Sequence, residues 1–157
     1  MAAILVGHPM AVGGVITGVD GTQLNPLGMR VRTDDAKEFI YLAGVAAQVS
    51  GDWNTFNAST YVAIRLAADA VGLVAIAMGA VLAANWGWYQ VYGFNTVSRS
   101  DTVAGAGGLF IDATVGRVDD ASVAGDFVNG AVSTGADTAN VLPVHISYPY
   151  VTNTVPA

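Results

Sequence analysis

The sequence contains no cysteine, a single lysine and a single glutamate among its 157 residues. The absence of cysteine excludes a disulfide framework and a thiolate metal site. Charged residues make up only 11% of the chain, whereas about a quarter of the residues in soluble domains are charged. Helical surfaces usually carry many Glu, Lys and Arg side chains, and that population is missing. Glycine, valine, threonine and asparagine are abundant instead, which favours β-structure with many turns.

The charge balance is acidic, with a formal net charge of −6. Arg30 and Arg32 form the one local basic pair, so no basic stripe exists to neutralise phosphates, and nucleic acid is not expected as a partner. Hydrophobic residues account for 53% of the chain. Such a chain would expose apolar surface as a monomer, and large exposed apolar patches mark interfaces. We therefore expect a homo-oligomer.

A long uncharged stretch, residues 70–98, raises the question of a membrane span. A spanning helix needs about 20 consecutive apolar residues. Here the apolar part is mostly Ala, Gly and Val, polar residues interrupt the remainder, and the flanks Asp69 and Arg99 provide no cationic cluster. Two buried strands with a tight connection are the favoured interpretation, without a membrane segment. The N-terminus also lacks the basic region and cleavage site of a signal peptide.

The most informative segment is Ala84–Gly93, with the sequence ANWGWYQVYG. Aromatic and β-branched residues alternate there with a period of two, which predicts a β-strand that ends at Gly93. No nucleophile, metal ligand or charge lies in it, so it indicates sheet building rather than catalysis. One face would carry Trp86, Trp88, Gln90 and Tyr92, and the other Gly87, Tyr89 and Val91.

Turn signals recur about every eight to twelve residues, the spacing typical of sandwiches and barrels. The fold class is therefore predicted as all-β, a single β-sandwich or barrel-like domain with long loops. Polar segments 51–60 and 98–108 are interpreted as a turn and a surface loop. Further strands are predicted over Met29–Arg32, Glu38–Ala43, Tyr61–Leu66, Gly72–Ala77, Leu109–Ala113, Thr114–Val118, Phe127–Val132 and Leu142–Tyr148, the last ended by Pro149.

The N-terminal part, residues 1–28, is interpreted separately from the β-domain of residues 29–157. Its first 19 residues are apolar and rich in glycine, which weakens regular pairing inside one sheet. Such a terminus is poorly ordered unless it is tied down. It would serve either as an extended arm that adds to a neighbouring subunit or to another protein, or as the first strand of its own domain. Both interpretations stay open.

The order of these segments resembles the capsid decoration, or cement, proteins of tailed bacteriophages. The resemblance covers residues 33 to 151, and its most specific part is the strand with the pattern Gly-Trp-x-Gln-Val-x-Gly. It rests on Glu38–Leu42, Val71–Ala75, Trp86–Gly93, Leu109-Phe110, Ala113–Asp120, Gly130–Val132 and Tyr148–Val151. The resemblance implies an all-β protein, commonly trimeric, on the outside of a capsid shell, with no catalytic residues to carry over.

Few residues could carry chemistry. His8 and His145 are the only imidazoles, and His145 would lie on the face of the last strand opposite Val144 and Ile146. A catalytic histidine needs a nucleophile or carboxylate partner that the local sequence does not supply. We therefore interpret both histidines as structural or interface residues.

Two short motifs are weak signals. The Asn57-Ala58-Ser59 sequon is a pattern frequent by chance. Residues 105–108 are rich in glycine but lack the Lys-Ser/Thr of a phosphate loop. Neither motif indicates a modification or a nucleotide site.

Two further groups leave alternatives open. Asp112, Asp119, Asp120 and Asp126 crowd one region and could offer oxygen ligands to Ca²⁺, but the glycine and glutamate of an EF-hand are missing, so a solvated acidic loop is favoured. The three tryptophans could form a platform for sugar stacking, but core or interface packing is favoured. They are Trp53, Trp86 and Trp88.

We therefore expect a structural virion protein rather than an enzyme, with no catalytic, cofactor or metal site. It would bind the major capsid protein on the outer surface of a phage head, after residence in the host cytoplasm, and stabilise the shell. The resemblance makes a trimer the favoured homo-oligomer, and an oligomeric clamp that engages several shell subunits would multiply weak contacts. The alternative is a receptor- or glycan-binding domain of a head or tail fibre that uses the tryptophans.

Overall fold

The computed structural model describes residues 16–153. It is all-β, as predicted, with one large antiparallel sheet that is folded on itself and does not close. The strands are β1 (Val19–Asp20), β2 (Arg30–Arg32), β3 (Glu38–Ala43), β4 (Trp53–Phe56), β5 (Ala63–Arg65), β6 (Gly72–Ala77), β7 (Trp86–Arg99), β8 (Gly107–Ile111), β9 (Val118–Asp119), β10 (Phe127–Ser133) and β11 (Val141–Val151).

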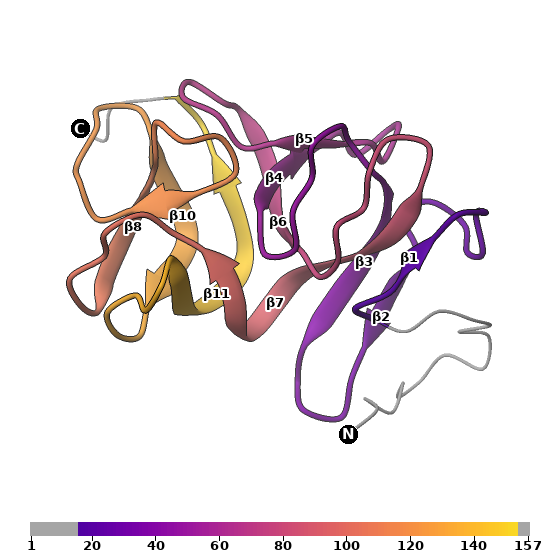
Figure 1. The fold of residues 1–157 in the computed structure, drawn as a ribbon, viewed down its shortest axis with the longest axis horizontal. Coiled ribbons are helices and arrows are strands. Elements are labelled where there is room, and N and C mark those ends of the chain that lie inside the picture. Colours follow the sequence, from indigo (N-terminus) through magenta and orange to yellow (C-terminus); the bar gives the residue numbers. More distant parts are fainter. Residues whose placement is uncertain (1–15, 154–157) are drawn as a thin grey trace.

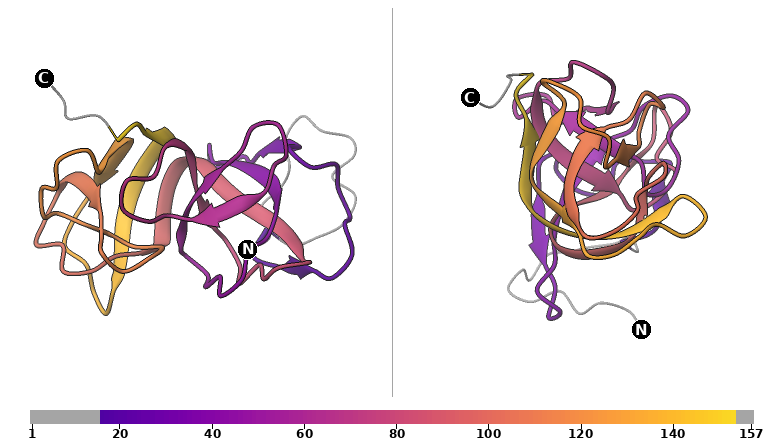
Figure 2. Two further views of the ribbon diagram at one scale, coloured as in Figure 1. Left: turned by 90° about the horizontal axis from the view of Figure 1, so that it is seen from above. Right: turned by 90° about the vertical axis from the view of Figure 1, so that its left-hand side faces the viewer.

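The strands run in the order β2-β3-β7-β6-β11-β10-β8-β9, while β1 pairs with β7, and β4 pairs with β5 and β6. The molecule is elongated and has two lobes (Figures 1 and 2). The first lobe holds β1 to β6 and the first half of β7. The second lobe holds the second half of β7 and β8 to β11. Strand β7 therefore belongs to both lobes and connects them.

The aromatic strand is confirmed but is longer than predicted. It passes through Gly93 instead of ending there, because Gly93 has a φ of +101° and bends the strand. Gln90 is buried and stabilises the bend: its Nε2 donates to the carbonyls of Tyr92 at 3.0 Å and Phe94 at 3.2 Å, and its Oε1 accepts from Asn95 Nδ2 at 2.8 Å. The first half pairs with β3 and β6, and the second half pairs with β11.

Both faces of the first half of β7 contribute to apolar clusters. Trp88 packs with Tyr41 in one cluster, with their ring centroids 5.0 Å apart, while Tyr89 and Val91 belong to a second cluster with Leu42. A third and larger cluster fills the second lobe and also includes residues of β4 and β6. The lobes therefore share packing and are not separate cores.

Three segments differ from their predicted structure. Segment 51–60 contains the buried strand β4: Asn54 looks like a loop residue, but its Nδ2 donates to the carbonyl of Asp52 at 2.8 Å. Of the predicted strand 114–118, only Val118 is in a strand, β9, because the Arg117 amide donates to the Thr114 carbonyl at 3.1 Å and closes a turn. The predicted loop 98–108 is shorter, because strands β7 and β8 extend into it from either side.

A fourth correction concerns Pro149, which does not end β11. Between its pairings with Ala131 and Asn129 of β10, strand β11 contains two more residues than β10 does, so it bulges there. Tyr148 has a φ of +46° in this bulge. Proline is tolerated in a strand at a bulge, where no ladder hydrogen bond is required of its nitrogen. The strand resumes with Tyr150 and pairs with β6.

The N-terminal part is described only from residue 16. Val19 pairs with Gly87 of β7, and the Tyr41 hydroxyl donates to Asp20 Oδ2 at 2.6 Å and accepts from the Leu24 amide at 3.2 Å. Residues 16–28 therefore pack on the first lobe. The preceding segment of the proposed arm, with His8, lies outside the described residues.

Candidate functional site

A solvent-facing cluster of charged and aromatic side chains lies where the two lobes meet. We call it the arginine–tyrosine surface. It consists of Arg30 and Arg32 of β2, Glu38 of β3, Tyr92 of β7, and His145 and Tyr148 of β11.

Strand register brings one row of this surface together. Arg32 pairs with Glu38 across β2 and β3, and Glu38 pairs with Tyr92 across β3 and β7. Side chains of directly paired residues point to the same face of a sheet, so the three lie side by side. Tyr92 in turn pairs with Ser147, at the start of the β11 bulge. Because of this bulge, Tyr148 points outward, with 46% of its surface exposed.

Glu38 connects the two halves of the surface. Its Oε1 pairs with Arg30 Nη1 at 2.9 Å, and its Oε2 accepts a hydrogen bond from the Tyr148 hydroxyl at 2.8 Å. The hydrogen bond to Glu38, partial burial and the negative charge of Glu38 raise the pKa of Tyr148, although both arginines oppose the rise. The phenol therefore stays a hydrogen-bond donor at neutral pH.

The two arginines differ in their partners. Arg30 is paired with Glu38, and its Cζ lies 5.8 Å from the centroid of the Tyr148 ring. Arg32 is exposed, and its Cζ lies 5.7 Å from the centroid of the Tyr92 ring. No carboxylate of the described residues lies within ion-pair distance of Arg32. The surface thus presents one guanidinium that rests on a ring and can bind an anionic group.

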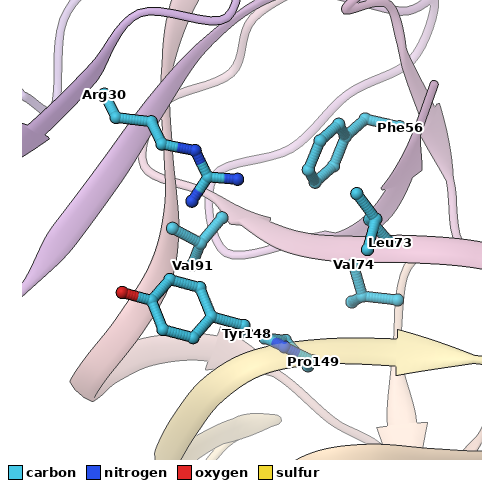
Figure 3. A pocket seen from close by; sticks show the side chains of 7 residues that line it. All are labelled: Arg30, Phe56, Leu73, Val74, Val91, Tyr148 and Pro149. Carbon is cyan, nitrogen blue, oxygen red and sulfur yellow. The ribbon is translucent and has the colours of Figure 1, made fainter. Parts of the chain in front are cut away.

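A shallow apolar pocket lies beside the cluster, with a volume of about 20 Å³, enough for one water molecule or a methyl group. Figure 3 shows the guanidinium of Arg30 and the ring of Tyr148 on one side of it. Its other lining side chains are apolar and come from β4, β6, β7 and β11: Phe56, Leu73, Val74, Val91 and Pro149.

The surface continues over the second lobe. Val132 of β10 pairs with His145 of β11, and His145 pairs with Phe94 of β7, so these three side chains form one row on the outer face. Phe94 and Val132 are 44% and 49% exposed. The ring of His145 meets the ring of Tyr92 edge to face, with centroids 6.2 Å apart. Exposed aromatic and arginine side chains are the types enriched in protein interfaces.

Sequence reasoning finds part of this surface. His145 lies on it, on the face opposite the buried Val144 and Ile146, as predicted. The local basic pair in β2 is also here, but Glu38, Tyr92 and Tyr148 carry no signal that singles them out as site residues. Alternation along the last strand would place Tyr148 on the same side as Ile146. The bulge in β11 reverses that side, and nothing in the alternating pattern predicts the reversal.

The four aspartates do not form a metal site, since no group of three or more candidate ligands gathers within the described part of the chain. They are not all solvated either. Asp112 and Asp126 are buried and accept hydrogen bonds from the amides of Thr114 at 2.7 Å and Asp69 at 3.0 Å. The favoured interpretation of a solvated acidic loop is therefore wrong for these two.

The other two aspartates lie at the surface and interact through their charges. Burial, followed by the charge of Asp112, raises the pKa of Asp119, and the charges of Asp120 and Asp101 add to that rise. The fold therefore holds several carboxylates close enough to repel one another.

The tryptophans do not form a platform. Trp53 and Trp88 are buried, at 0% and 2% exposed, and belong to different apolar clusters. Trp86 is half-buried against the cluster that contains Trp88. Packing in the core, the favoured interpretation, is therefore correct for Trp53 and Trp88. Of the three tryptophans on which the glycan-binding alternative is based, only Trp86 keeps a partly exposed ring.

The remaining motifs have local roles. Asn57 Oδ1 accepts from the amides of Ser59 at 2.7 Å and Thr60 at 3.2 Å, which makes the sequon an exposed turn. Gly107 and Gly108 begin strand β8, and the Gly107 amide donates to Ser133 Oγ at 2.8 Å. This glycine segment is thus part of the sheet.

A second charged cluster has no signal in the sequence because its members are far apart in the chain. Asp52 is fully buried and pairs with Arg65 Nε at 2.8 Å and with Arg99 Nη1 at 2.7 Å. Its Oδ2 also accepts from the Val49 amide at 3.0 Å, and Arg65 donates to the Val115 carbonyl at 2.8 Å. This Asp52 cluster fixes the end of β7 to β4 and β5.

Comparison with protein-family models, with curated proteins and with solved structures finds no match to this chain. Within residues 16–153, no helix has the length and apolar character required to cross a membrane.

Proposed function

We propose that this chain is a structural virion protein, a decoration protein that binds the outer surface of a tailed-phage capsid as a homo-oligomer and stabilises the shell. The observation that carries the proposal is the continuous exposed surface formed by the arginine–tyrosine surface and the row of Phe94, His145 and Val132. Large aromatic side chains are exposed there on a chain with only 11% charged residues. Such surfaces are characteristic of proteins that bury them against other proteins.

The geometry suits a mechanical role. A shared core and the bent strands β7 and β11 join the two lobes, and the Asp52 cluster fixes the end of β7. A clamp of this kind transmits force between its contact surfaces without a moving part. Several linked copies that bind adjacent shell subunits would gain avidity from contacts that are weak one at a time. The resemblance of residues 33–151 to decoration proteins points to the capsid as the partner.

The test is quantitative and uses purified virions of the phage that encodes the chain. A shell built from repeated subunits offers many equivalent sites, so a decoration protein should be present at on the order of hundreds of copies per particle. Removal of the protein from the particles should lower the temperature at which the shell opens, and adding purified protein back should restore it. Absence from the shell, or a shell that opens at the same temperature without it, would contradict the proposal.

A receptor-binding role gives the opposite result. A fibre domain would be found at a few copies per particle, on the tail or a head fibre, and the purified protein would bind glycans or host cells. Because Trp53 and Trp88 are buried, any glycan contact would have to use other rings, such as the half-buried Trp86 or the rings of Tyr92 and Tyr148. Loss of cell binding in a Tyr148→Ala variant that melts normally would favour that role over the capsid role.

A further inference from the structure

The proposed function leaves open how the copies contact one another, and the charge distribution of the chain addresses this. The chain has a net charge of −6, yet two of its six basic residues lie two positions apart in β2 on the arginine–tyrosine surface. Arg32 has no carboxylate partner among the described residues, and its guanidinium lies over the ring of Tyr92. A guanidinium stacked on an aromatic ring is well suited to a carboxylate, because its planar fork is already oriented.

The second lobe carries the complementary charge. Asp101 follows β7, and Asp119 and Asp120 lie at the end of β9. These three carboxylates lie beyond ion-pair distance of every described lysine and arginine. They also repel one another: burial is the main cause of the raised pKa of Asp119, and the charges of Asp112, Asp120 and Asp101 add to the rise. We call Asp101, Asp119 and Asp120 the acidic edge.

The two charged regions belong to different lobes. Strand β2, with Arg32, lies in the first lobe, whereas β8, which pairs with β9 at the acidic edge, lies in the second (Figure 1). Arg32 and the acidic edge of one copy are therefore not placed to meet within that copy. They can meet between two copies arranged head to tail.

We infer that the arginine–tyrosine surface of one copy binds the acidic edge of a second copy, with Arg32 facing Asp120. Asp120 is the exposed member of the edge, and its carboxylate is held near the loop backbone by the Ala104 amide at 2.8 Å. Phe94, Val132 and the pocket beside Tyr148 provide apolar area around this charge pair. A contact between two different patches repeats from copy to copy and forms a ring when the rotation closes. The inference rests on the homo-oligomer part of the proposed function, and it assigns the exposed surface that carries that proposal to the contact between copies rather than to the shell.

Charge reversal tests the contact. We expect Arg32→Glu and Asp120→Arg each to weaken self-association by at least about tenfold, because each places like charges opposite one another. The double variant places opposite charges across the contact again, with their positions exchanged, so association should return. Asp69→Arg makes the same charge change in an exposed loop outside both surfaces and should leave association unaltered. Light scattering across a dilution series measures the association, and melting curves check that every variant folds.

Three results would overturn the inference. The first is a wild-type protein that remains monomeric at concentrations on the order of 10 μM, high enough to reveal ordinary stable oligomers. The second is an oligomer that neither single variant weakens. The third is an Arg32→Glu protein that stays oligomeric but no longer binds shells, which would assign this surface to the capsid instead. The first and third results leave the proposed capsid role standing if the wild-type protein binds shells, so failure of the contact and failure of the function are distinguishable.

Discussion

The Asp52 cluster and the arginine–tyrosine surface both combine arginines with a carboxylate. They differ in burial and in whether every arginine has a carboxylate partner within the described residues. Asp52 is fully buried, and two arginines and a backbone amide satisfy its two oxygens. On the surface, a single carboxylate, Glu38, binds Arg30 and Tyr148, and Arg32 is left without a carboxylate from residues 16–153. The first arrangement is complete within the fold. The second has binding capacity that the described fold does not use, which is why we assign it to a partner.

The largest difference between the two regions should appear when the carboxylate is removed. In Asp52→Ala, the half-buried Arg65 and Arg99 lose their counter-charge, and breaking a buried pair from one side typically costs about 3–5 kcal/mol. Because both arginines keep 21% of their side-chain surface exposed, we expect a loss toward the low end of that range. Urea denaturation measures it.

The exposed pair of Asp35 and Lys37, with N and O 2.7 Å apart, offers a matched control. Asp35→Ala should cost less than about 1 kcal/mol, as exposed ion pairs do. If Asp52→Ala and Asp35→Ala lower the free energy of unfolding equally, the Asp52 cluster is not the structural clamp that its burial indicates.

A pair of phenols sharpens the contrast between satisfied and unsatisfied buried groups. Tyr41 donates to Asp20 and accepts from Leu24, and burial with the Asp20 hydrogen bond raises its pKa to about 12. The hydroxyl of Tyr89 has no hydrogen-bond partner among the described residues, and burial, with the nearby charge of Asp52, raises its pKa as well. Tyr41→Phe should therefore cost about 1–2 kcal/mol, whereas Tyr89→Phe should be neutral or stabilise by about 1 kcal/mol.

Both variants remove one hydroxyl oxygen. The difference between their free energies of unfolding therefore reports the contribution of the hydrogen bonds rather than that of packing. Chemical denaturation of both proteins under one set of conditions provides the measurement. Equal losses in the two would mean that the Tyr89 hydroxyl contributes a favourable interaction in the fold, and the contrast would fail.

On the surface itself, Glu38→Gln should have a smaller effect on stability. The exchange keeps the shape and leaves an acceptor for Tyr148, so the loss should stay below about 1 kcal/mol. The hydrogen bond to the charged carboxylate is the main cause of the raised pKa of Tyr148. Without that charge, its pKa should fall toward the ordinary value of 10.0. NMR titration of the tyrosine ring carbons, with Tyr148→Phe to assign the signal, follows this change, and an unaltered pKa would mean that Glu38 does not hold the phenol.

Whether such a feature can be predicted from the sequence depends on how far apart along the chain the interacting residues lie. Strand β3 and the aromatic start of β7 follow from alternation, because neighbouring residues must point to opposite faces of a strand. Strand β4 is not predicted, because Asn54 and Thr55 are residue types that are common in loops. Their burial is explained only by the pairing of β4 with β5 on one side and β6 on the other. Local pattern contains no information about partners that far away.

Prediction of the candidate site from the sequence has the same limit. The arginine pair in β2 is visible in the sequence, and so is the outward face of His145 in the last strand. Their meeting with Tyr148 depends on a bulge in β11, 110 residues after Glu38. The Asp52 cluster similarly joins residues 13 and 47 positions apart. Proline ends a regular strand, but Pro149 lies in the bulge of β11, where a proline can be accommodated within the strand.

The smallest expected effect concerns the acidic edge and depends on pH. In the folded chain the pKa of Asp119 is raised, so the fold favours the protonated carboxyl relative to the unfolded chain. The folded state then binds more protons, and stability falls as the pH rises from the ordinary pKa of 3.8 through the folded pKa. Above the folded pKa, the fold retains this penalty. Below the ordinary value, the penalty is absent.

Asp119→Asn removes the charge and keeps an oxygen that can accept from the Ala121 amide, 3.2 Å away. The variant should be more stable than the wild type at pH 7, by less than about 1 kcal/mol since the group is largely solvated. The difference should shrink as the pH falls through the raised pKa of Asp119 and should be absent below the ordinary pKa of 3.8. Asp34→Asn removes the same charge from an exposed turn and serves as the control for net charge. Both are measured by thermal melting at a dilution that keeps copies apart, because an arginine from a second copy would supply the missing counter-charge. If the higher stability of Asp119→Asn persisted unchanged in acid, Asp119 would destabilise the fold through its shape rather than its charge. The acidic edge would then lack the charge repulsion that makes it a partner for Arg32.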